Sequence, residues 1–326
     1  MAEQTSSSAD RPIESAEDTI RRIFGGSNSS LGAEMANVST RYRRVHETTF
    51  PKPSRTRLIA VANQKGGVGK TTTAVNVSAA LAQSGANVLV IDMDPQGNAS
   101  TALGIPHASG EPSVYDVLEG RLGIQEVKRQ CPDFPSLEVV PASIDLSGAE
   151  LEIADMPNRN NLLKVALNNY LASSDKHYDY VIIDCPPSLG LLVINAMCAV
   201  TEMMIPIQAE YYALEGLGQL INTIGLIQQN FNSDLIVSTM LVTMFDKRTL
   251  LSREVYEEVK NHYPNIVLDA TIPRTVKISE APSFGRSVIA YDPHGMGAVS
   301  YAEAALEIAQ RSEAILHIID DRKHEG

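Results

Sequence analysis

The 326-residue chain contains no tryptophan, and aromatic residues make up only 5% of it, so its core must be largely aliphatic. The cysteines are Cys131, Cys185 and Cys198, which lie far apart in the sequence and form no C-x-x-C pair. This spacing argues against a disulfide framework or a zinc site. It favours a protein that works in a reducing compartment.

Long apolar runs are also missing. The most apolar long stretch, residues 189–207, is interrupted by Asn195, Thr201 and Glu202. It is too short and too polar to span a bilayer. Residues 1–11 are polar and lack the apolar centre of a signal peptide. We therefore expect a cytoplasmic protein with no membrane partner.

An excess of basic charge is absent as well, because the formal net charge is -12. The acidic residues are concentrated between residues 58 and 240, whereas residues 241–291 hold nearly equal numbers of acidic and basic side chains. Binding to phosphate depends on the local field, and net charge mainly sets solubility and steering. Composition therefore neither excludes nor supports a nucleic-acid partner.

Residues 1–56 have the composition of a flexible, disordered tail, rich in Ser, Gly, Asn and charge, and they end in the linker-like Pro51-Lys52-Pro53. Two shorter segments leave another interpretation open. Residues 14–24 place apolar side chains on one helical face, and residues 41–44 form a basic cluster. Either segment is a candidate helix or arm that orders on a partner.

From residue 57 onward, short apolar runs alternate with segments of helical periodicity. The runs are residues 58–62, 88–91, 137–140, 180–183, 203–207, 235–242 and 266–272. The helical segments include residues 72–83, 162–172, 214–231 and 252–262, with a last helix from about 299 to 319. This order predicts an α/β fold with a mostly parallel twisted sheet covered by helices on both faces. We expect one domain over residues 57–319 and a short C-terminal tail over 320–326.

The most informative segment follows the first apolar run and reads Gln64-Lys65-Gly66-Gly67-Val68-Gly69-Lys70-Thr71-Thr72. A glycine-rich turn between a strand and a helix directs backbone N–H groups at phosphates, and the helix N-terminus adds partial positive charge. Such a P-loop predicts that Lys70 reaches the β- and γ-phosphates of a nucleotide and that the Thr71 hydroxyl is a ligand of Mg²⁺.

Two further strands end in aspartate. The second strand runs into Asp92-Met93-Asp94-Pro95-Gln96-Gly97-Asn98, where Asp94 is placed to orient or activate the attacking water. For Asp92 two roles stay open: a part in the nucleotide site, or a purely structural role in a turn or as a helix cap. The strand at 180–183 ends in Asp184, followed by two prolines, which predicts a Walker B carboxylate that meets Mg²⁺. Cys185 next to it is expected to be a buried, inert thiol.

The sequence Lys-Gly-Gly-Val-Gly-Lys-Thr resembles the deviant Walker A loop of the ParA/MinD ATPases, with Gln64 where an ordinary P-loop has glycine. The segments at Asp94 and Asp184 resemble switch I and switch II of the ParA/Soj branch. The resemblance implies that Lys65 reaches the partner's phosphates in an ATP-dependent homodimer. A cation delivered in this way stabilises charge on the transferring phosphoryl group.

A third segment, residues 272–285, resembles the chromosomal ParA/Soj proteins. The resemblance implies that Pro273 lies against the adenine and that Arg274, Lys277 and Arg248 face DNA. A few such cations neutralise phosphates without reading bases, so binding to double-stranded DNA would be non-specific and salt-dependent.

The resemblance extends over residues 57–319 and implies an ATP-dependent switch for chromosome or plasmid segregation. A ParB-type centromere-binding protein would stimulate slow hydrolysis and release the dimer from the nucleoid. The alternatives are a MinD-like membrane-associated ATPase, an iron–sulfur carrier and a metabolic P-loop enzyme. The acidic and polar end of the chain disfavours the first alternative, the scattered cysteines disfavour the second, and the third lacks a second-substrate motif.

Overall fold

The computed structural model describes residues 30–210 and 213–325, which fall in two compact units, 1–47 and 48–326. The described part of the first unit is helix α2 (Ser30–Glu47), in a region whose composition predicts a flexible tail. Its Ala, Glu, Met and Arg residues favour a helix, and no proline occurs between Ser30 and Pro51. The basic cluster at residues 41–44 lies in the last turns of α2, and residues 14–24 lie outside the described residues.

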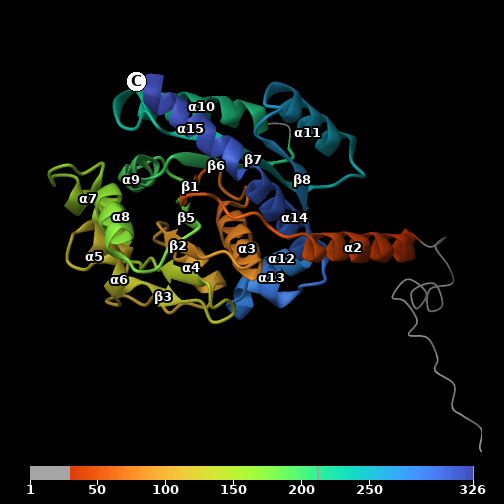
Figure 1. The fold of residues 1–326 in the computed structure, drawn as a ribbon, viewed down its shortest axis with the longest axis horizontal. Coiled ribbons are helices and arrows are strands. Elements are labelled where there is room, and N and C mark those ends of the chain that lie inside the picture. Colours follow the sequence, from red (N-terminus) through yellow and green to blue (C-terminus); the bar gives the residue numbers. More distant parts are fainter. Residues whose placement is uncertain (1–29, 211–212, 326) are drawn as a thin grey trace, which may run out of the picture. The chain divides into compact units, whose positions relative to one another are not determined.

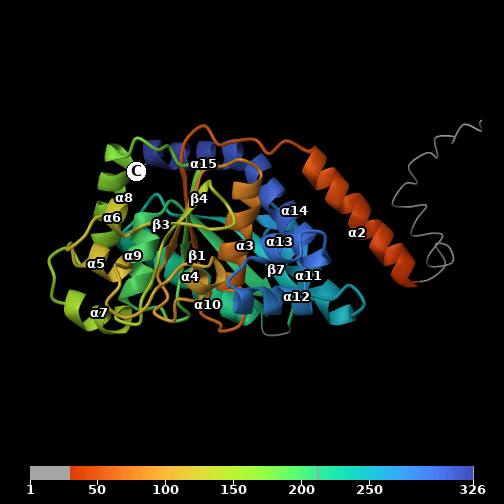
Figure 2. The same ribbon diagram turned by 90° about the horizontal axis from the view of Figure 1, so that it is seen from below.

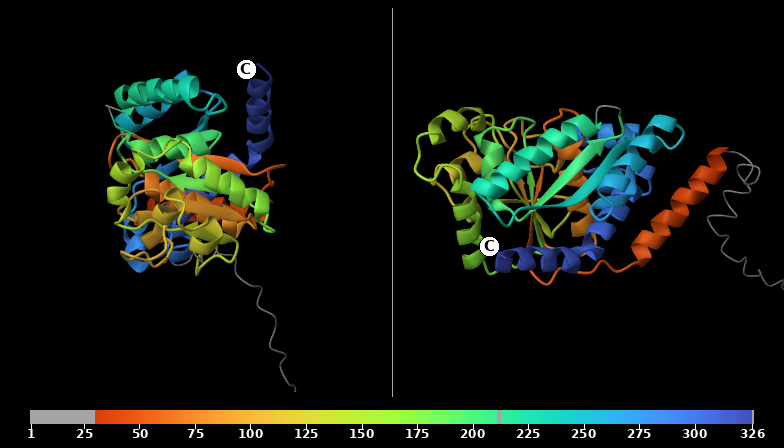
Figure 3. Two further views of the ribbon diagram at one scale, coloured as in Figure 1. Left: turned by 90° about the vertical axis from the view of Figure 1, so that its left-hand side faces the viewer. Right: turned by 90° about the horizontal axis from the view of Figure 1, so that it is seen from above.

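The second unit is built on an eight-stranded sheet with the order β3-β4-β2-β5-β1-β6-β7-β8. Its strands are β1 (Arg57–Val61), β2 (Val88–Asp92), β3 (Arg129–Gln130), β4 (Leu137–Val140), β5 (Tyr180–Asp184), β6 (Glu202–Gln208), β7 (Ile236–Phe245) and β8 (Val267–Pro273). All neighbours pair in parallel except β3 and β4. The predicted mostly parallel sheet is thus confirmed, and Figure 3 shows its twist. The two-residue edge strand β3 is too short and too polar to give an apolar run in the sequence.

Helices cover both faces of this sheet, as expected (Figure 1). One face carries α3 (Lys70–Gln83), α4 (Asn98–Ala102), α12 (Val276–Glu280), the 3-10 helix η1 (Ala281–Phe284), α13 (Val288–Tyr291) and α14 (Met296–Gln310). The opposite face carries α8 (Leu162–Ser173), α9 (Leu191–Ala199), α10 (Ala213–Asn230) and α11 (Leu250–His262). The short helices α5 (Val114–Leu118), α6 (Ile124–Val127) and α7 (Leu146–Ile153) lie beside α8.

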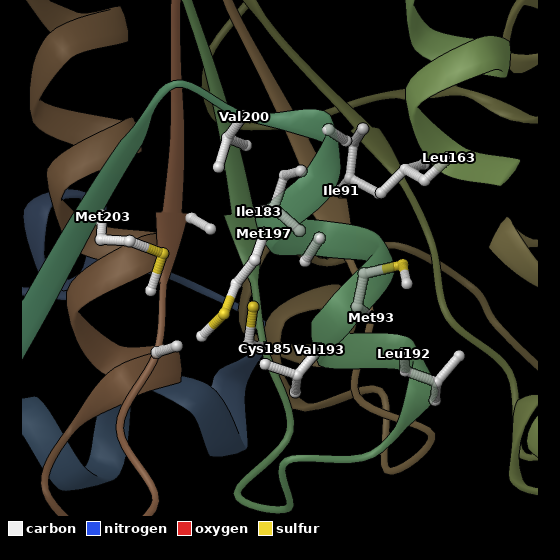
Figure 4. Close-up of a cluster of buried hydrophobic side chains, with 14 of the residues drawn as sticks. Ile91, Met93, Leu163, Ile183, Cys185, Leu192, Val193, Met197, Val200 and Met203 are labelled. Carbon is white, nitrogen blue, oxygen red and sulfur yellow. The ribbon is translucent and has the colours of Figure 1, made fainter. Parts of the chain in front are cut away.

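The core on the α8–α9 face is aliphatic and rich in methionine, in keeping with the lack of tryptophan. Successive strand residues point to opposite faces, so every second residue of β2, β5 and β6 reaches this core. Figure 4 shows Ile91, Ile183 and Met203 from these strands gathered around Val193 and Met197 of α9. The intervening strand residues face α3, the helix that follows the glycine-rich loop.

The end of the chain differs from the sequence-based expectation. Two helices, α14 and α15 (Ser312–Glu325), stand where one helix and a tail were predicted. The apolar side chains Ile315, Leu316 and Ile319 of α15 are buried against Ile236. Figure 2 shows α15 crossing the end of the sheet. This tertiary contact orders residues that look like a polar tail in isolation. Within the described part of the chain, we find no helix with the length and apolarity needed to cross a bilayer.

A fully buried ion pair joins the beginnings of β1 and β6 to these last helices. Arg57 Nε and Nη2 donate to the Glu202 carboxylate at 2.8 and 2.5 Å, and the two side chains are 1% and 0% exposed. Arg57 Nη1 also donates to the Ile308 carbonyl and the Ser312 hydroxyl at 2.8 and 3.1 Å. Each buried charge is therefore met by an opposite charge and by hydrogen bonds, as a charge in an apolar interior requires.

We expect Arg57→Met to lower the free energy of unfolding by about 3–5 kcal/mol, because it leaves the Glu202 carboxylate buried without its partner. The double variant Arg57→Met/Glu202→Leu should recover most of that loss. Arg55→Met is the matched control, because Arg55 pairs with Asp320 at the surface, where both side chains are more than 40% exposed. Such a pair is worth about 0–1 kcal/mol. Urea unfolding measures all three, and equal losses for Arg57→Met and Arg55→Met would contradict the assignment.

Glu138 in β4 accepts hydrogen bonds from three side chains, two of them in the loop before β5. Lys128 and Lys176 lie 2.9 and 2.8 Å from its carboxylate, and the Tyr178 hydroxyl also donates to it. Burial acts to raise the pKa of Glu138, but the hydrogen bonds from Lys176, Tyr178 and Lys128 outweigh it and lower that pKa to about 2.

Because the pKa of Glu138 is lower in the folded chain, its ionised form stabilises the fold above its ordinary pKa of 4.5. That contribution is lost as the pH falls from about 4.5 towards 2. We therefore expect Glu138→Gln to be less stable than the unchanged protein at pH 7 and less sensitive to acid between pH 4.5 and 2. Thermal unfolding over this pH range tests it, with Glu111→Gln, on an exposed carboxylate, as the control. Parallel pH curves for the unchanged protein and Glu138→Gln would refute the role of this carboxylate.

Candidate active site

The glycine-rich loop spans the gap between the end of β1 and the start of α3, as its sequence predicts. Gly67 and Gly69 adopt φ angles of 75° and 87°, a left-handed region that favours glycine. A Cβ added at Gly66 or Gly67 would meet nothing within 4 Å. The backbone at Gly66 and Gly67 therefore borders open space just before the N-terminus of α3, whereas Val68 is buried. That geometry suits an anion such as a nucleotide phosphate.

Two residues that the sequence-based interpretation missed hold this loop in place. Asn63 accepts a hydrogen bond from the Lys65 backbone N–H at 3.0 Å and donates to the Pro206 carbonyl at 2.8 Å. The Thr243 hydroxyl in β7 donates to the Val68 carbonyl at 2.8 Å. Asn63 lies next to the motif, but Thr243 is 175 residues away in the sequence and only the sheet order brings it there.

Lys70 is the first residue of α3 and is buried, with 7% of its surface exposed. Its ammonium donates to the Lys65 carbonyl at 3.3 Å. Burial lowers the pKa of Lys70, whereas the charges of Asp184 and Asp94 act to raise it. The lysine predicted to reach phosphate is thus held over the loop between the two predicted carboxylates. Thr71 and Thr72 follow it in the first turn of the helix.

Asp184 ends β5 and is completely buried. Neither of its carboxylate oxygens has a hydrogen-bond partner among the described residues. Burial and the neighbouring Asp92 and Asp94 raise the pKa of Asp184 well above its ordinary value, although Thr71 and Lys70 act in the opposite direction. A buried carboxylate without donors is costly unless something else binds it. A hydrated divalent cation beside Thr71 would meet that need.

The two aspartates after β2 differ in their contacts. Asp92 is fully buried and accepts hydrogen bonds from the Ser100 backbone N–H and hydroxyl at 2.8 and 2.7 Å. Burial raises the pKa of Asp92 to about 6, against these hydrogen bonds. Asp92 therefore fastens α4, and of its two alternative roles the contacts favour the structural one. Asp94 is 7% exposed, and its carboxylate accepts one hydrogen bond within the described part of the chain, from the Gln96 backbone N–H at 3.0 Å.

Lys65 points to a carboxylate of its own chain. Its ammonium lies 3.1 Å from Glu210 Oε2, and the two side chains are 37% and 50% exposed. The Gln208 side chain donates to the other oxygen of Glu210. Glu210 was not singled out from the sequence, because an acidic residue after a strand carries no signal by itself. This pairing keeps Lys65 at the surface beside the loop.

The segment predicted to meet adenine and DNA begins where β8 ends. Pro273 pairs with Phe245 at the end of β7. Arg274 and Lys277 follow Pro273, and Arg248 follows β7, so these three basic residues lie at one edge of the sheet. All three side chains are exposed.

A cavity of about 270 Å³ opens beside Thr71 and Thr72. It is lined by residues of α3, α4, α12, η1 and the turn before α13, among them Asn98, Ile278 and Pro282. Pro273 is not among its lining residues. A larger hollow of about 420 Å³ at residues 154–161 contains none of the predicted site residues.

The oxygen atoms of Thr71 and Asp184 suit Mg²⁺ bound together with a nucleotide, rather than a metal ion held by protein side chains alone. Among residues 30–210 and 213–325, no group of three or more His, Cys, Asp or Glu side chains could hold a metal ion. Mg²⁺ commonly binds through one or two protein oxygens together with phosphates and waters. Thr71 and Asp184 fit that pattern. The three cysteines are buried in different parts of the fold, and burial raises the pKa of the Cys185 thiol, which keeps it protonated.

The fold and the loop define a P-loop nucleoside triphosphatase, and comparisons with known proteins agree. A family model described as an AAA domain matches residues 56–237. The chain is 49% identical over 253 residues to the sporulation initiation inhibitor protein Soj of Bacillus subtilis, a match that covers 78% of this chain and 98% of that protein. It is 46% identical over 255 residues to the chromosome partitioning protein ParA of Myxococcus xanthus, with 78% and 88% covered.

Among solved structures, the chain resembles one described as cobyrinic acid a,c-diamide synthase from Mycobacterium smegmatis with a bound ATP analogue and magnesium. The identity is 37%, the TM-score is 0.67, and the match covers 79% of this chain and 96% of that one. The chain belongs to the Soj/ParA family of chromosome-partitioning ATPases.

Substitution by asparagine should change the free energy of unfolding in opposite directions at Asp184 and at Asp92. In the absence of nucleotide at pH 7, we expect Asp184→Asn to raise the free energy of unfolding, because it removes a buried negative charge whose burial and neighbouring aspartates outweigh the effect of Thr71 and Lys70. This gain should vanish as the pH falls through the raised pKa of Asp184, where the native side chain is already neutral. Asp92→Asn should lower stability by about 1–3 kcal/mol, because both Asp92 oxygens accept from backbone N–H groups, of Asp94 and Ser100, and the new NH2 group must face one of these donors.

Thermal unfolding with and without MgATP measures both effects. Asp184→Asn should also lose most of the stabilisation that MgATP gives the unchanged protein, whereas a folded Asp92→Asn should keep it. If Asp184→Asn instead destabilises the protein without nucleotide, the Asp184 carboxylate is already compensated in the folded chain and our interpretation is wrong.

Proposed function

We propose that the chain is an ATP-dependent switch for chromosome segregation whose ATP-bound dimer binds DNA non-specifically. The observation that carries the enzymatic part is the buried Asp184 carboxylate, without a hydrogen bond, next to Lys70, Thr71 and the open glycine loop. The names of the relatives support the partitioning role.

In this proposal the chain's own groups bind and orient the triphosphate. The backbone N–H groups of residues 66–71 and the Lys70 ammonium hold the phosphates, and Thr72, in the first turn of α3, is assigned to the same nucleotide. Thr71 and Asp184 hold Mg²⁺, which would neutralise charge on the phosphate oxygens. Asp94, with few competing hydrogen bonds, orients the attacking water. Its position at the end of β2 places it on the same edge of the sheet as the loop.

The dimer completes the site. For Lys65 to reach the phosphates of a second copy it must leave Glu210, to which it is bound in the single chain. A phosphate carries more negative charge than a carboxylate and supplies more acceptors, so the exchange is favourable when the partner brings ATP. Closure would therefore depend on nucleotide. A ParB-type centromere-binding protein would then stimulate the slow hydrolysis that reopens the dimer.

DNA binding is assigned to the edge that carries Arg248, Arg274 and Lys277, and Pro273 is assigned to the adenine. A dimer doubles the number of these cations, which turns weak contacts into useful avidity. The protein would then reside on the nucleoid in the cytoplasm. The resemblance of residues 272–285 to chromosomal members favours a chromosomal rather than a plasmid role.

The alternative is a MinD-like ATPase that binds membranes through a C-terminal amphipathic helix. The last described helix, α15, buries Ile315, Leu316 and Ile319 in the fold, so these apolar side chains are already occupied. This packing favours the DNA-binding assignment over the membrane-binding one.

We expect the protein to bind a random-sequence duplex in the presence of ATP, more weakly with ADP or without nucleotide, and progressively less as salt increases. Arg274→Glu should reduce this binding at least tenfold, since it replaces a phosphate contact by a repulsion. Lys164→Glu, on α8 across the sheet from α12, is the matched control and should bind normally (Figure 1). Fluorescence anisotropy measures the binding, and liposome sedimentation is run alongside. Liposome binding without DNA binding would support the MinD-like alternative and refute the assignment of these cations.

A further inference from the structure

The two basic segments leave adjacent strands at the same place. Phe245 and Pro273 are register partners at the ends of β7 and β8. Residues 246–248 and 274–277 follow directly, so the two segments start side by side. Neighbouring strands of a sheet lie about 5 Å apart. This spacing is shorter than the Debye length of about 8 Å at physiological salt, so a charge on one segment acts on a phosphate bound to the other.

Arg248 is bound by a carboxylate from its own segment. Its Nε and Nη2 donate to the two oxygens of Asp246 at 2.9 and 2.8 Å, a bidentate pair. The Arg248 backbone N–H also donates to Asp246 Oδ1 at 3.0 Å. These hydrogen bonds from Arg248 lower the pKa of Asp246 to about 2, so the carboxylate is ionised at every physiological pH.

Lys277 has a similar counterion. Its ammonium lies 3.0 Å from Glu280 Oε2, one turn further along α12. The Tyr291 hydroxyl donates to the same oxygen at 3.3 Å, and the Tyr291 ring centre lies 5.3 Å from the ammonium. The nearby Glu280 raises the pKa of Lys277. Arg274, by contrast, forms no ion pair within the described part of the chain.

These carboxylates halve the charge that the edge offers to DNA. Asp246, Lys247 and Arg248 leave one net positive charge on the first segment. Arg274, Lys277 and Glu280 leave one on the second. Without the two acids a single copy would carry four positive charges here, the same as two unchanged copies together. Affinity for duplex DNA depends steeply on the number of phosphates neutralised.

We propose that Asp246 and Glu280 are built-in counterions that keep the DNA affinity of a single copy low and so make stable binding require two copies. The inference rests on the proposed DNA binding. DNA phosphates must displace the carboxylates from Arg248 and Lys277, and the displaced carboxylates remain close enough to repel the phosphates. One copy gains little from this exchange, whereas two copies bound to one duplex add their contacts.

The test compares Asp246→Asn, Glu280→Gln and the double variant with the unchanged full-length protein. Asn at position 246 retains the Oδ1 acceptor for the Arg248 backbone N–H, so the turn is preserved. Asp175→Asn is the matched control. Asp175 is an exposed carboxylate without an ion pair in the described residues, in the loop before β5 at the opposite end of the parallel strands, and its substitution changes the net charge by the same amount. Thermal unfolding verifies that each variant is folded.

Anisotropy titrations use a random-sequence duplex with ATP and without nucleotide, each over a salt series. We expect each single variant to bind about three- to tenfold more tightly than the unchanged protein, with a steeper salt dependence. Without nucleotide, the double variant should bind at least tenfold more tightly than the unchanged protein. Asp175→Asn should match the unchanged protein.

Two results would overturn the inference while leaving the proposed function intact. One is ATP-dependent DNA binding by the unchanged protein that neither Asp246→Asn nor Glu280→Gln alters. The other is an equal gain from Asp175→Asn, which would show an effect of net charge alone. Failure of every protein, including the double variant, to bind DNA in either nucleotide state would overturn both the inference and the proposed DNA-binding function.

Discussion

Three parallel strands, β1, β2 and β5, end in register, and the rest of the site depends on that alignment. Val61 pairs with Asp184, and Asp184 pairs with Asp92, so the loop and the carboxylates leave one edge of the sheet together. Alternation of side chains then turns both aspartates towards α3, away from the aliphatic core on the other face. The helix N-terminus and Lys70 meet a cluster of buried negative charge there. An anion-binding loop and a cation-binding carboxylate thus share one small volume.

Buried charge is treated differently at the two ends of the sheet. At the amino end, Arg57 and Glu202 form a closed pair in which hydrogen bonds satisfy both groups, which fixes β1, β6 and the last helices. At the carboxyl end, Asp184 has no donor and its pKa is raised. The first arrangement contributes to a single, well-defined structure. The second costs stability in the chain without nucleotide, and under the proposed function Mg²⁺ would relieve that cost.

Three of the four cations that the resemblance directs towards phosphates are held by carboxylates of the same chain, and Arg274 is the exception among the described residues. Lys65 binds Glu210, Arg248 binds Asp246 and Lys277 binds Glu280. In each pair the side chains are exposed to solvent, where ion pairs contribute little to stability. Their effect is instead on exchange, because a phosphate must compete with a carboxylate that is already in place. Nucleotide, second copy and DNA would each meet the same kind of competition.

Local sequence patterns determined most of the secondary structure and the position of the phosphate-binding loop. Apolar runs and helical periodicity predicted seven of the strands and the main helices, and the glycine-rich loop identified the phosphate-binding segment. Sequence could not show that Thr243 anchors the loop or that Glu210 holds Lys65, because these contacts join residues whose proximity arises only from sheet order. The contact between Asp92 and Ser100 is local, over eight residues, and it agrees with the structural role that the sequence left open for Asp92. Residues 30–47 form a helix whose local propensity the polar composition of the segment conceals. Helix α15 is instead ordered by burial against β7, which the sequence of the segment alone does not show. Backbone propensity and periodicity are local properties, whereas the partner of a charge is decided by packing.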